Sequence, residues 1–275
     1  MRILALETST QYCSCALSIN GETRASHVDA GQSHSDLLLP AVARLMSEAG
    51  LAFSQLDAIA FGAGPGSFTG LRIACGVAQG LAFAHDLPVA AVASTEALAE
   101  GAAREHAATR VITAFDARMG ELYLAAYERV GGTGGPEPDW RELLAPQLAR
   151  PDALPALPVL PGVAAWFGAG SGFAAYGAAL LARYAPMQID AACVPHAAAV
   201  AAIGARRAAR GQTVAAEHAA PLYVRDKVAL DVREQAALRA ANALRVALAA
   251  AASVSLVSPV SSAAVSPAPA AKAAA

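Results

Sequence analysis

A glycine-rich segment occurs twice in this chain, each time ahead of an apolar run with helical spacing. The first copy is FGAGPGSFTGLRIACGVAQGLAF at 61–83, and the second is FGAGSGFAAYGAALL at 167–181, a shift of 106 residues. A second pair recurs at a shift of 109: ILALETST at 3–10 and ITAFDARM at 112–119. Because both pairs occur in the same order, we infer an internal duplication.

The duplicated segments predict strands that alternate with helices. Each apolar run, followed by an acid (Glu7 or Asp116) and a second alternating stretch, is typical of a hairpin with the acid at its turn. In the first half we expect a helix over 33–50, and strands over 56–64 and 88–94. This order indicates an α/β protein.

The second half repeats the pattern more loosely. We expect a strand leading into the second glycine loop, a helix over 198–211 and a last extended piece, APLYVRD. The predicted lobes are residues 1–108 and 109–228. The Ala-, Ser- and Pro-rich tail, 229–275, is expected to hold a short helix and then disordered chain. Its long uncharged run is interrupted by Pro259 and has weak hydrophobic drive, so no membrane span is predicted.

Charge and cysteine usage exclude some classes of protein. The formal net charge is −2, so no global positive field draws this chain onto nucleic acid. The four cysteines have no C-x-x-C spacing, and we interpret them as buried reduced thiols. The apolar run before Glu7 is too short for a signal peptide, which predicts a cytoplasmic protein.

The first glycine loop allows two interpretations. Glycines ahead of a helix can bring backbone N–H groups close to a phosphate, but the loop lacks the lysine of a Walker A motif and does not match G-x-G-x-x-G. A tight strand-to-helix turn is the equal alternative. The candidate nucleotide or phosphate residues are Glu7, Ser9, Thr10, Gly64, Gly66, Ser67 and Asp116.

The two acids at the hairpin turns also allow two roles. Glu7 and Asp116 could hold a metal–phosphate or a catalytic water, or could accept hydrogen bonds within their turns. The six histidines include no H-x-x-x-H or H-E-x-x-H pair, so no metal site is predicted. No G-x-S-x-G motif is present, and no catalytic residue is assigned.

The run after the first glycine loop predicts a helix that is apolar nearly all round. Gly70, Ala74, Val77 and Leu81 share one face, and Arg72 and Gln79 mark a narrow polar strip. Such a helix must be buried on both sides. One side can face the sheet, and we expect the other to meet a neighbouring helix or another chain.

Four segments together resemble the TsaB family, whose members are dimerisation subunits of the bacterial machinery that makes N6-threonylcarbamoyladenosine in tRNA. The segments are ILALETST, FGAGPGSFTGLRIACGVAQGLAF, FDARMGELYLAAY and PLYVRDKVA, and the resemblance covers residues 1–228. It implies two duplicated lobes of the actin-like, sugar-kinase-like and Hsp70-like ATPase class. One departure is Glu7, where many relatives have Asp.

The resemblance also implies a role and partners. The chain would be a non-catalytic scaffold that heterodimerises with the TsaD-type transferase, with a TsaE-type ATPase joining the assembly. Contact with tRNA would be indirect, and ATP or ADP would belong to the complex interface and not to this chain alone. The implied contact residues lie on two helices: His34, Leu38, Val42, Leu71, Ala74, Val77, Ala78 and Leu81.

Rival functions follow from the residues alone. Two acidic turns and two glycine loops would also suit an autonomous ATP-dependent small-molecule kinase. A peptidase is the weakest alternative, because zinc ligands and a catalytic triad are missing. The sequence does not decide whether the free chain forms a homodimer through the same apolar face.

Overall fold

A computed structural model describes residues 1–131, 138–158 and 165–225 of the 275-residue chain. The described residues all belong to one compact unit. The helix and disorder predicted for 229–275 lie outside the described residues. No helix in the described part is long and apolar enough to cross a membrane.

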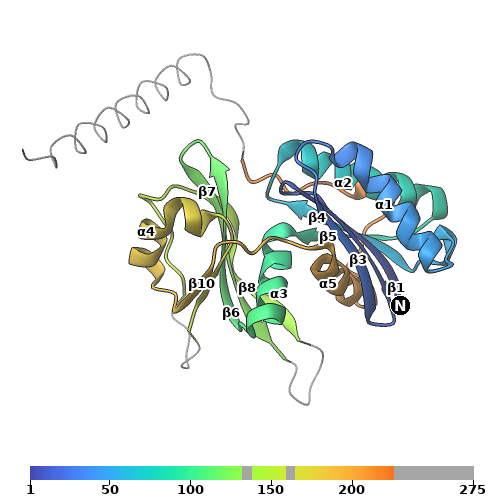
Figure 1. The fold of residues 1–275 in the computed structure, drawn as a ribbon. Coiled ribbons are helices and arrows are strands. Elements are labelled where there is room, and N and C mark those ends of the chain that lie inside the picture. Colours follow the sequence, from blue (N-terminus) through green and yellow to red (C-terminus); the bar gives the residue numbers. More distant parts are fainter. Residues whose placement is uncertain (132–137, 159–164, 226–275) are drawn as a thin grey trace, which may run out of the picture. The chain divides into compact units, whose positions relative to one another are not determined.

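The first half of the chain forms a mixed five-stranded sheet in the order β3-β2-β1-β4-β5 (Figure 1). Its strands are β1 (Arg2–Glu7), β2 (Tyr12–Ile19), β3 (Glu22–Asp29), β4 (Ala58–Gly64) and β5 (Val89–Ala93). The pairs β1–β2 and β2–β3 are antiparallel, whereas β1–β4 and β4–β5 are parallel. As predicted, the first hairpin turns directly after Glu7.

The second half forms another five-stranded sheet with the same connectivity. Its strands are β6 (Arg110–Arg118), β7 (Glu121–Val130), β8 (Asp139–Ala149), β9 (Phe167–Ala169) and β10 (Gln188–Asp190). Their order is β10-β9-β6-β7-β8, again with two antiparallel and two parallel pairs. The equivalent topology confirms the duplication and the α/β class.

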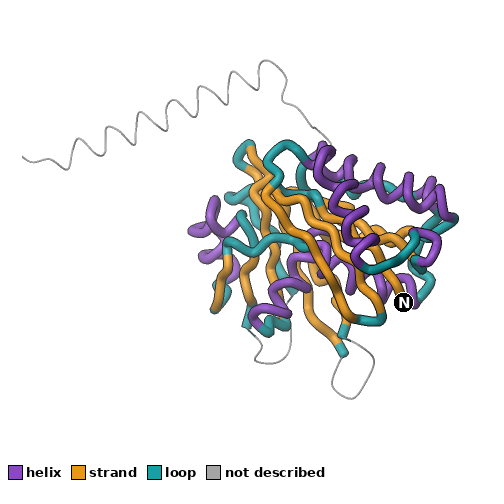
Figure 2. The backbone as a smooth tube through the Cα atoms, turned by 45° about the vertical axis from the view of Figure 1, so that its right-hand side comes forward, coloured by secondary structure: helices purple, strands orange, loops and turns teal. Residues whose placement is uncertain are grey.

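Helices cover both sheets, as Figure 2 shows. They are α1 (His34–Glu48), α2 (Phe68–His85), α3 (Ser94–His106), α4 (Gly172–Tyr184) and α5 (Ala197–Ala209), with short 3-10 turns η1 (Phe53–Gln55) and η2 (Ala216–His218). α2 follows β4 and α4 follows β9, which are equivalent strands of the two sheets. Both helices lie where the two glycine-rich segments predict them.

Two helices are exchanged between the halves. α3 follows β5 of the first sheet and buries Ala97 in that sheet's core, yet Leu98 and Ala102 pack against Val111 of the second sheet. α5 follows β10 of the second sheet, yet Val200 and Ile203 belong to the core of the first sheet. The division at residue 108 therefore describes the order of the chain, whereas packing assigns α5 to the first sheet.

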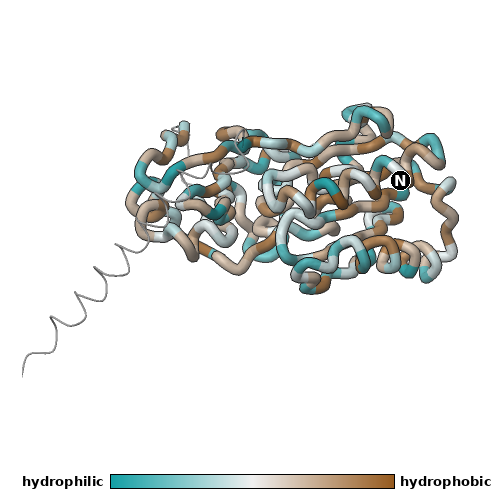
Figure 3. The backbone as a smooth tube through the Cα atoms, turned by 90° about the horizontal axis from the view of Figure 1, so that it is seen from above, coloured by the Kyte–Doolittle hydropathy of each residue, from teal (hydrophilic) through white to brown (hydrophobic). Residues whose placement is uncertain are grey.

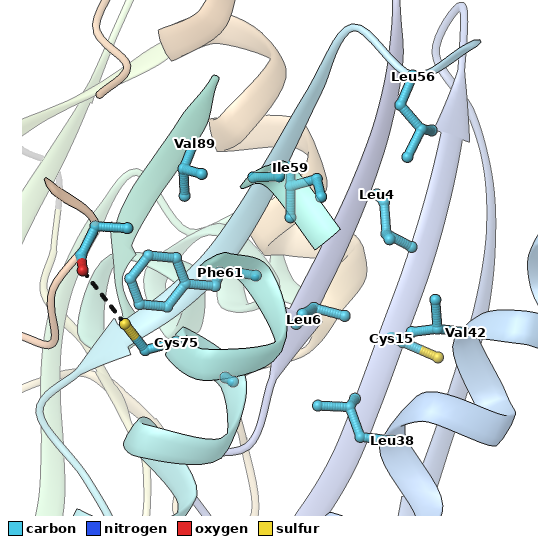
Figure 4. Packing of buried hydrophobic residues seen from close by; sticks show 14 of the residues in the cluster. Leu4, Leu6, Cys15, Leu38, Val42, Leu56, Ile59, Phe61, Cys75 and Val89 are labelled. Atoms are coloured by element: carbon cyan, nitrogen blue, oxygen red, sulfur yellow. Dashed lines mark hydrogen bonds between the residues drawn. The ribbon is translucent and has the colours of Figure 1, made fainter. Parts of the chain in front are cut away.

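The period of two along β1 divides the first core into two layers. Leu4 and Leu6 face α1 and α2, and Ile3 and Ala5 face α5. In Figure 4, Leu38 of α1 points toward this sheet. The α5 side consists largely of alanine, so α5 can approach the strands closely and both faces of the sheet are sealed.

Candidate functional site

The first glycine loop packs directly on the first hairpin turn. Ser67 caps α2 by accepting a hydrogen bond from the N–H of Gly70 at 3.3 Å, and Thr8 Oγ1 donates to the Gly70 carbonyl at 2.7 Å. A Cβ at Gly70 would lie 1.9 Å from the Thr8 carbonyl oxygen. Glycine is therefore required here for close backbone approach.

The chain itself uses the N–H of Ser67, one of the donors that a phosphate at this loop would need. The N–H of Ser67 donates to the Ser9 carbonyl at 2.7 Å, and a Cβ at Gly66 would lie 2.5 Å from that oxygen. Gly64 is buried, and the preceding Ala63 carbonyl accepts from the N–H of Leu222 at 2.7 Å. Of the two interpretations of this loop, the packing favours the strand-to-helix turn.

Glu7 is buried behind this loop. Its Oε1 accepts from the N–H of Ser9 at 2.6 Å, and its Oε2 accepts from Ser94 Oγ at 3.0 Å. A Cβ at Gly62 would lie 1.9 Å from Oε2, so the strand beside the carboxyl must carry glycine. Burial raises the pKa of Glu7 in spite of these hydrogen bonds. The predicted phosphate residue Thr10 instead gives its carbonyl to His34 Nε2 at 2.9 Å.

Asp116, at the equivalent turn, has a different environment. Its Oδ1 accepts from the N–H of Arg118 at 2.9 Å and from the Tyr176 hydroxyl at 3.3 Å. Its own N–H donates to Ser171 Oγ at 3.1 Å. Both acids thus accept hydrogen bonds within or beside their turns.

Most of the predicted partner-contact residues lie inside the chain's own core. Six are buried against the first sheet: His34, Leu38, Val42, Leu71, Ala74 and Ala78. Val77 and Leu81 are partly buried at the edge of the same cluster. These six side chains cannot meet a partner in the folded chain, because they face the strands. A partner surface on these helices must instead use the residues that face outward.

The outward surface of α1 and α2, here called the α1/α2 face, carries exposed apolar side chains and small residues beside charged ones such as Arg44 and Glu48. Its exposed apolar side chains include Leu39 at 49% and Phe83 at 78% exposure. Gly76 and Gly80 are exposed in the interior of α2, and a Cβ at either would meet nothing within 4 Å. Apolar residues, brown in Figure 3, occur along helices as well as strands.

The polar strip of α2 is occupied by the chain's own residues 219–223. Gln79 Nε2 donates to the Ala219 carbonyl at 2.9 Å, and Arg72 Nε donates to the Tyr223 hydroxyl at 3.1 Å. The Arg72 guanidinium also lies 3.9 Å from the centroid of the Phe68 ring. Part of the surface of α2 that faces away from the sheet is therefore covered by residues 219–223 of the same chain. The helical pattern alone did not reveal this contact.

The tight basic cluster of α5 is neutralised by acids. Arg206 pairs with Glu100 at 2.9 Å, Arg207 pairs with Glu96, and Arg210 pairs with Asp139. Burial opposes ionisation of Glu100, but Arg206 outweighs it and lowers the pKa of that carboxyl. These guanidinium groups thus support the exchanged helices and form no free basic patch for RNA.

One group of metal-ligating side chains escaped the sequence patterns. Glu105 and His106 end α3, and Asp190 and Cys193 follow 84 or more residues later. Their candidate ligand atoms all lie within 4.8 Å of one another. The missed signal is two short pairs, Glu-His and Asp-x-x-Cys, which only the exchanged α3 brings together.

Two relatives decide the family. A TsaB of Escherichia coli, described as a tRNA threonylcarbamoyladenosine biosynthesis protein, is 36% identical over 83% of this chain and 96% of that protein. The Haemophilus influenzae TsaB is 41% identical over 64% of this chain and 74% of its own length. This chain belongs to the TsaB family.

A family model and a solved structure agree with that membership. Residues 28–260 match the model of TsaD, tRNA N6-adenosine threonylcarbamoyltransferase. A Pseudomonas aeruginosa structure, described as similar to peptidase YEAZ, is 42% identical with a TM-score of 0.72, over 82% of this chain and 99% of that one. In the described part of this TsaB-family chain, no serine hydroxyl is hydrogen-bonded to a histidine ring. The described residues therefore do not form the serine–histidine pair of a serine peptidase.

Proposed function

We propose that this TsaB-family chain is a non-catalytic subunit that binds a TsaD-type transferase and supports threonylcarbamoylation of N6 of the anticodon-adjacent adenosine in tRNA. Its membership of a family named for tRNA threonylcarbamoyladenosine biosynthesis supports the pathway. Its match to the TsaD family model supports descent of the two subunits from a common fold. We assign the two sheets to the actin-like, sugar-kinase-like and Hsp70-like ATPase class.

The proposal that this chain binds a partner rests on the α1/α2 face. Glycine in a helix interior costs about 1 kcal/mol relative to alanine. Gly76 and Gly80 bring this cost, although no neighbouring group in the described chain requires their lack of a side chain. Close approach of a helix from another protein would require residues without side chains at these two positions. The exposed Phe83 of α2 and Leu39 of α1 would supply apolar contact on the same two helices.

A non-catalytic role is supported by the interior of the first hairpin turn. Glu7 is fully buried and faces Ser9 and Ser94, where a raised pKa disfavours the charge that would hold a metal–phosphate. The kinase alternative requires an ionised, accessible acid at this turn. No nucleotide of the chain's own is proposed, and ATP or ADP is assigned to the interface with the transferase.

The remaining partners follow from the same arrangement. Because the cluster at Arg206 is paired with acids, we assign tRNA contact mainly to the transferase. A TsaE-type ATPase would join the two-subunit complex. The apolar α1/α2 face would pair two copies when the transferase is absent. The cytoplasm, where tRNA is modified, is the proposed location.

Reconstitution tests this function. The chain, the cognate TsaD-type subunit and tRNA would be combined with threonylcarbamoyl-adenylate, and formation of the modified adenosine would be measured. We expect the chain alone to be inactive and the pair to be active. Glu7→Gln and Asp116→Asn should retain this activity, since neither acid does chemistry here. Activity of the chain alone, or its loss in both variants, would contradict the proposal.

A further inference from the structure

The end of α3 and the segment after β10 bring four different metal-ligating side chains together. His106 Nε2 lies 3.1 Å from Asp190 Oδ2, and the candidate ligand atoms of Glu105 and Cys193 complete a group within 4.8 Å. The set offers one nitrogen, one sulfur and two carboxylates. None of these residues belongs to the α1/α2 face or to the glycine loops.

The second sheet holds two of the donors in place. The His106 ring stacks on Phe167 of β9 with centroids 4.8 Å apart. Asp190 ends β10, its carbonyl accepts from the N–H of Gly170 at 3.0 Å, and its Oδ1 accepts from the N–H of Ala192 at 2.9 Å. The last bond forms a tight turn that brings Cys193 back toward Asp190. Preorganised donors of this kind lower the cost of binding an ion.

A cavity gives access to the group. It has a volume of about 250 Å³ and is lined by Glu105, Asp190 and Cys193, with His196 and apolar residues around them. An ion can therefore reach these three donors from solvent without opening the core, and Glu105 is exposed, so its side chain can swing toward the ion.

The donor chemistry selects the class of metal. Magnesium and calcium prefer oxygen ligands throughout, whereas a thiolate and an imidazole with carboxylates suit zinc. Bonds of about 2.0–2.3 Å in a tetrahedral zinc site place ligand atoms roughly 3.3–3.8 Å apart. The separations within 4.8 Å therefore need only a small contraction, which rotation of Glu105 and Cys193 can provide.

We propose that Glu105, His106, Asp190 and Cys193 bind one zinc ion. Four protein ligands make a closed site, which is typical of structural zinc and not of catalysis. The ion would clamp α3, which comes from the first half of the chain, to the segment that carries the chain from β10 to α5. The exchange of helices between the two sheets would then be fixed at the point where the chain crosses back.

Binding must displace the thiol proton. A cysteine thiol without a bound metal is mostly protonated near neutral pH. On binding, the S–H bond breaks, the sulfur bonds to zinc and the proton passes to solvent. Affinity for zinc should therefore increase with pH.

Metal titration of the tag-free full-length chain tests the site. After treatment with chelator, Zn²⁺ or Co²⁺ would be added, with Co²⁺ reporting a thiolate-to-metal charge-transfer band. We expect one equivalent to bind and to raise the melting temperature. Cys193→Ser should remove the band, and His106→Gln should weaken binding by more than about tenfold. Cys75→Ser and His218→Gln are matched controls that should bind as the wild type does.

A fold-safe variant keeps the test decisive. Glu105 is exposed, so Glu105→Gln should fold like the wild type and still weaken zinc binding, even if Cys193→Ser fails to fold. Absence of stoichiometric binding by the wild type would overturn the proposal. So would binding that is unchanged in Glu105→Gln together with His106→Gln.

Discussion

Glu7 Oε2 accepts a hydrogen bond from Ser94 Oγ at 3.0 Å, inside the chain. Glu7 ends β1, and Ser94 begins α3, the helix that follows the first sheet and packs on the second through Leu98 and Ala102. The acid that the sequence marks as a candidate phosphate ligand therefore holds the start of an exchanged helix. This contact links the end of β1 to the first residue of α3.

Glu7→Gln should keep the fold and make stability less dependent on pH. Burial raises the pKa of Glu7 above its ordinary value of 4.5, so the folded state keeps the proton longer than the unfolded state does. The free energy of unfolding of the wild type should thus fall as pH rises above 4.5, and glutamine removes this contribution. Chemical denaturation from pH 4.5 to 8 measures it. A steeper fall in Glu7→Gln would contradict the assignment.

Ala74→Arg should unfold the chain. Ala74 is 0% exposed and lies between α2 and the first sheet. A buried unpaired charge costs roughly 3–5 kcal/mol, a large part of the stability of a domain. Val77→Asp, at the partly buried edge, should leave a folded chain. Circular dichroism during heating compares the two, and a wild-type melting curve for Ala74→Arg would show that this side of α2 is not core.

Gly76→Ala and Gly80→Ala should stabilise the isolated chain and weaken the complex. Each removes a helix-interior glycine whose Cβ would meet nothing within 4 Å, which should gain up to about 1 kcal/mol. The added methyl groups would hold a partner helix away. Melting temperature and affinity for the TsaD-type subunit should therefore change in opposite directions. A gain in stability with unchanged affinity would place the partner elsewhere.

His27 should make the chain less stable in acid. Its ring stacks on Tyr12 and lies 3.9 Å from the centroid of His196, and burial with that neighbour lowers its pKa from 6.5 to about 4. The unfolded state binds the proton first, so stability falls as pH drops from about 6.5 to about 4. His27→Gln should reduce this loss, whereas the exposed His218→Gln should not. An equal dependence of the free energy of unfolding on pH in the two variants would refute this prediction.

The repeats predicted the architecture well because they fall on the elements that define each sheet. Glu7 and Asp116 mark the hairpins, and the two glycine segments mark the entries to α2 and α4. β3 was missed because this edge strand, Glu22–Asp29, is mostly exposed and polar, without a buried alternation. α3 was not predicted, and the packing of α5 on the first sheet was missed because chain order does not state which sheet a helix covers.

The candidate site was harder to predict than the fold. In an alanine- and glycine-rich helix, residues that pack on a sheet resemble residues that meet a partner, so the sequence did not show that Ala74 and Ala78 are buried against the first sheet. Gly76 and Gly80 are exposed, unlike Ala74 and Ala78, and this difference can be read only from the structure. The group of metal-ligating side chains around Cys193 was not predicted for another reason, because its members come from segments far apart in the sequence.

Affinity of Gly80→Arg for the TsaD-type subunit, measured by light scattering of the mixture, tests the proposed partner surface most directly. The matched control is Gly177→Arg on α4, where a Cβ also meets nothing within 4 Å. Both variants should fold, because both side chains point to open space. We expect Gly177→Arg to form the heterodimer and Gly80→Arg to remain separate from the transferase. A normal heterodimer with Gly80→Arg would contradict the assignment of the α1/α2 face.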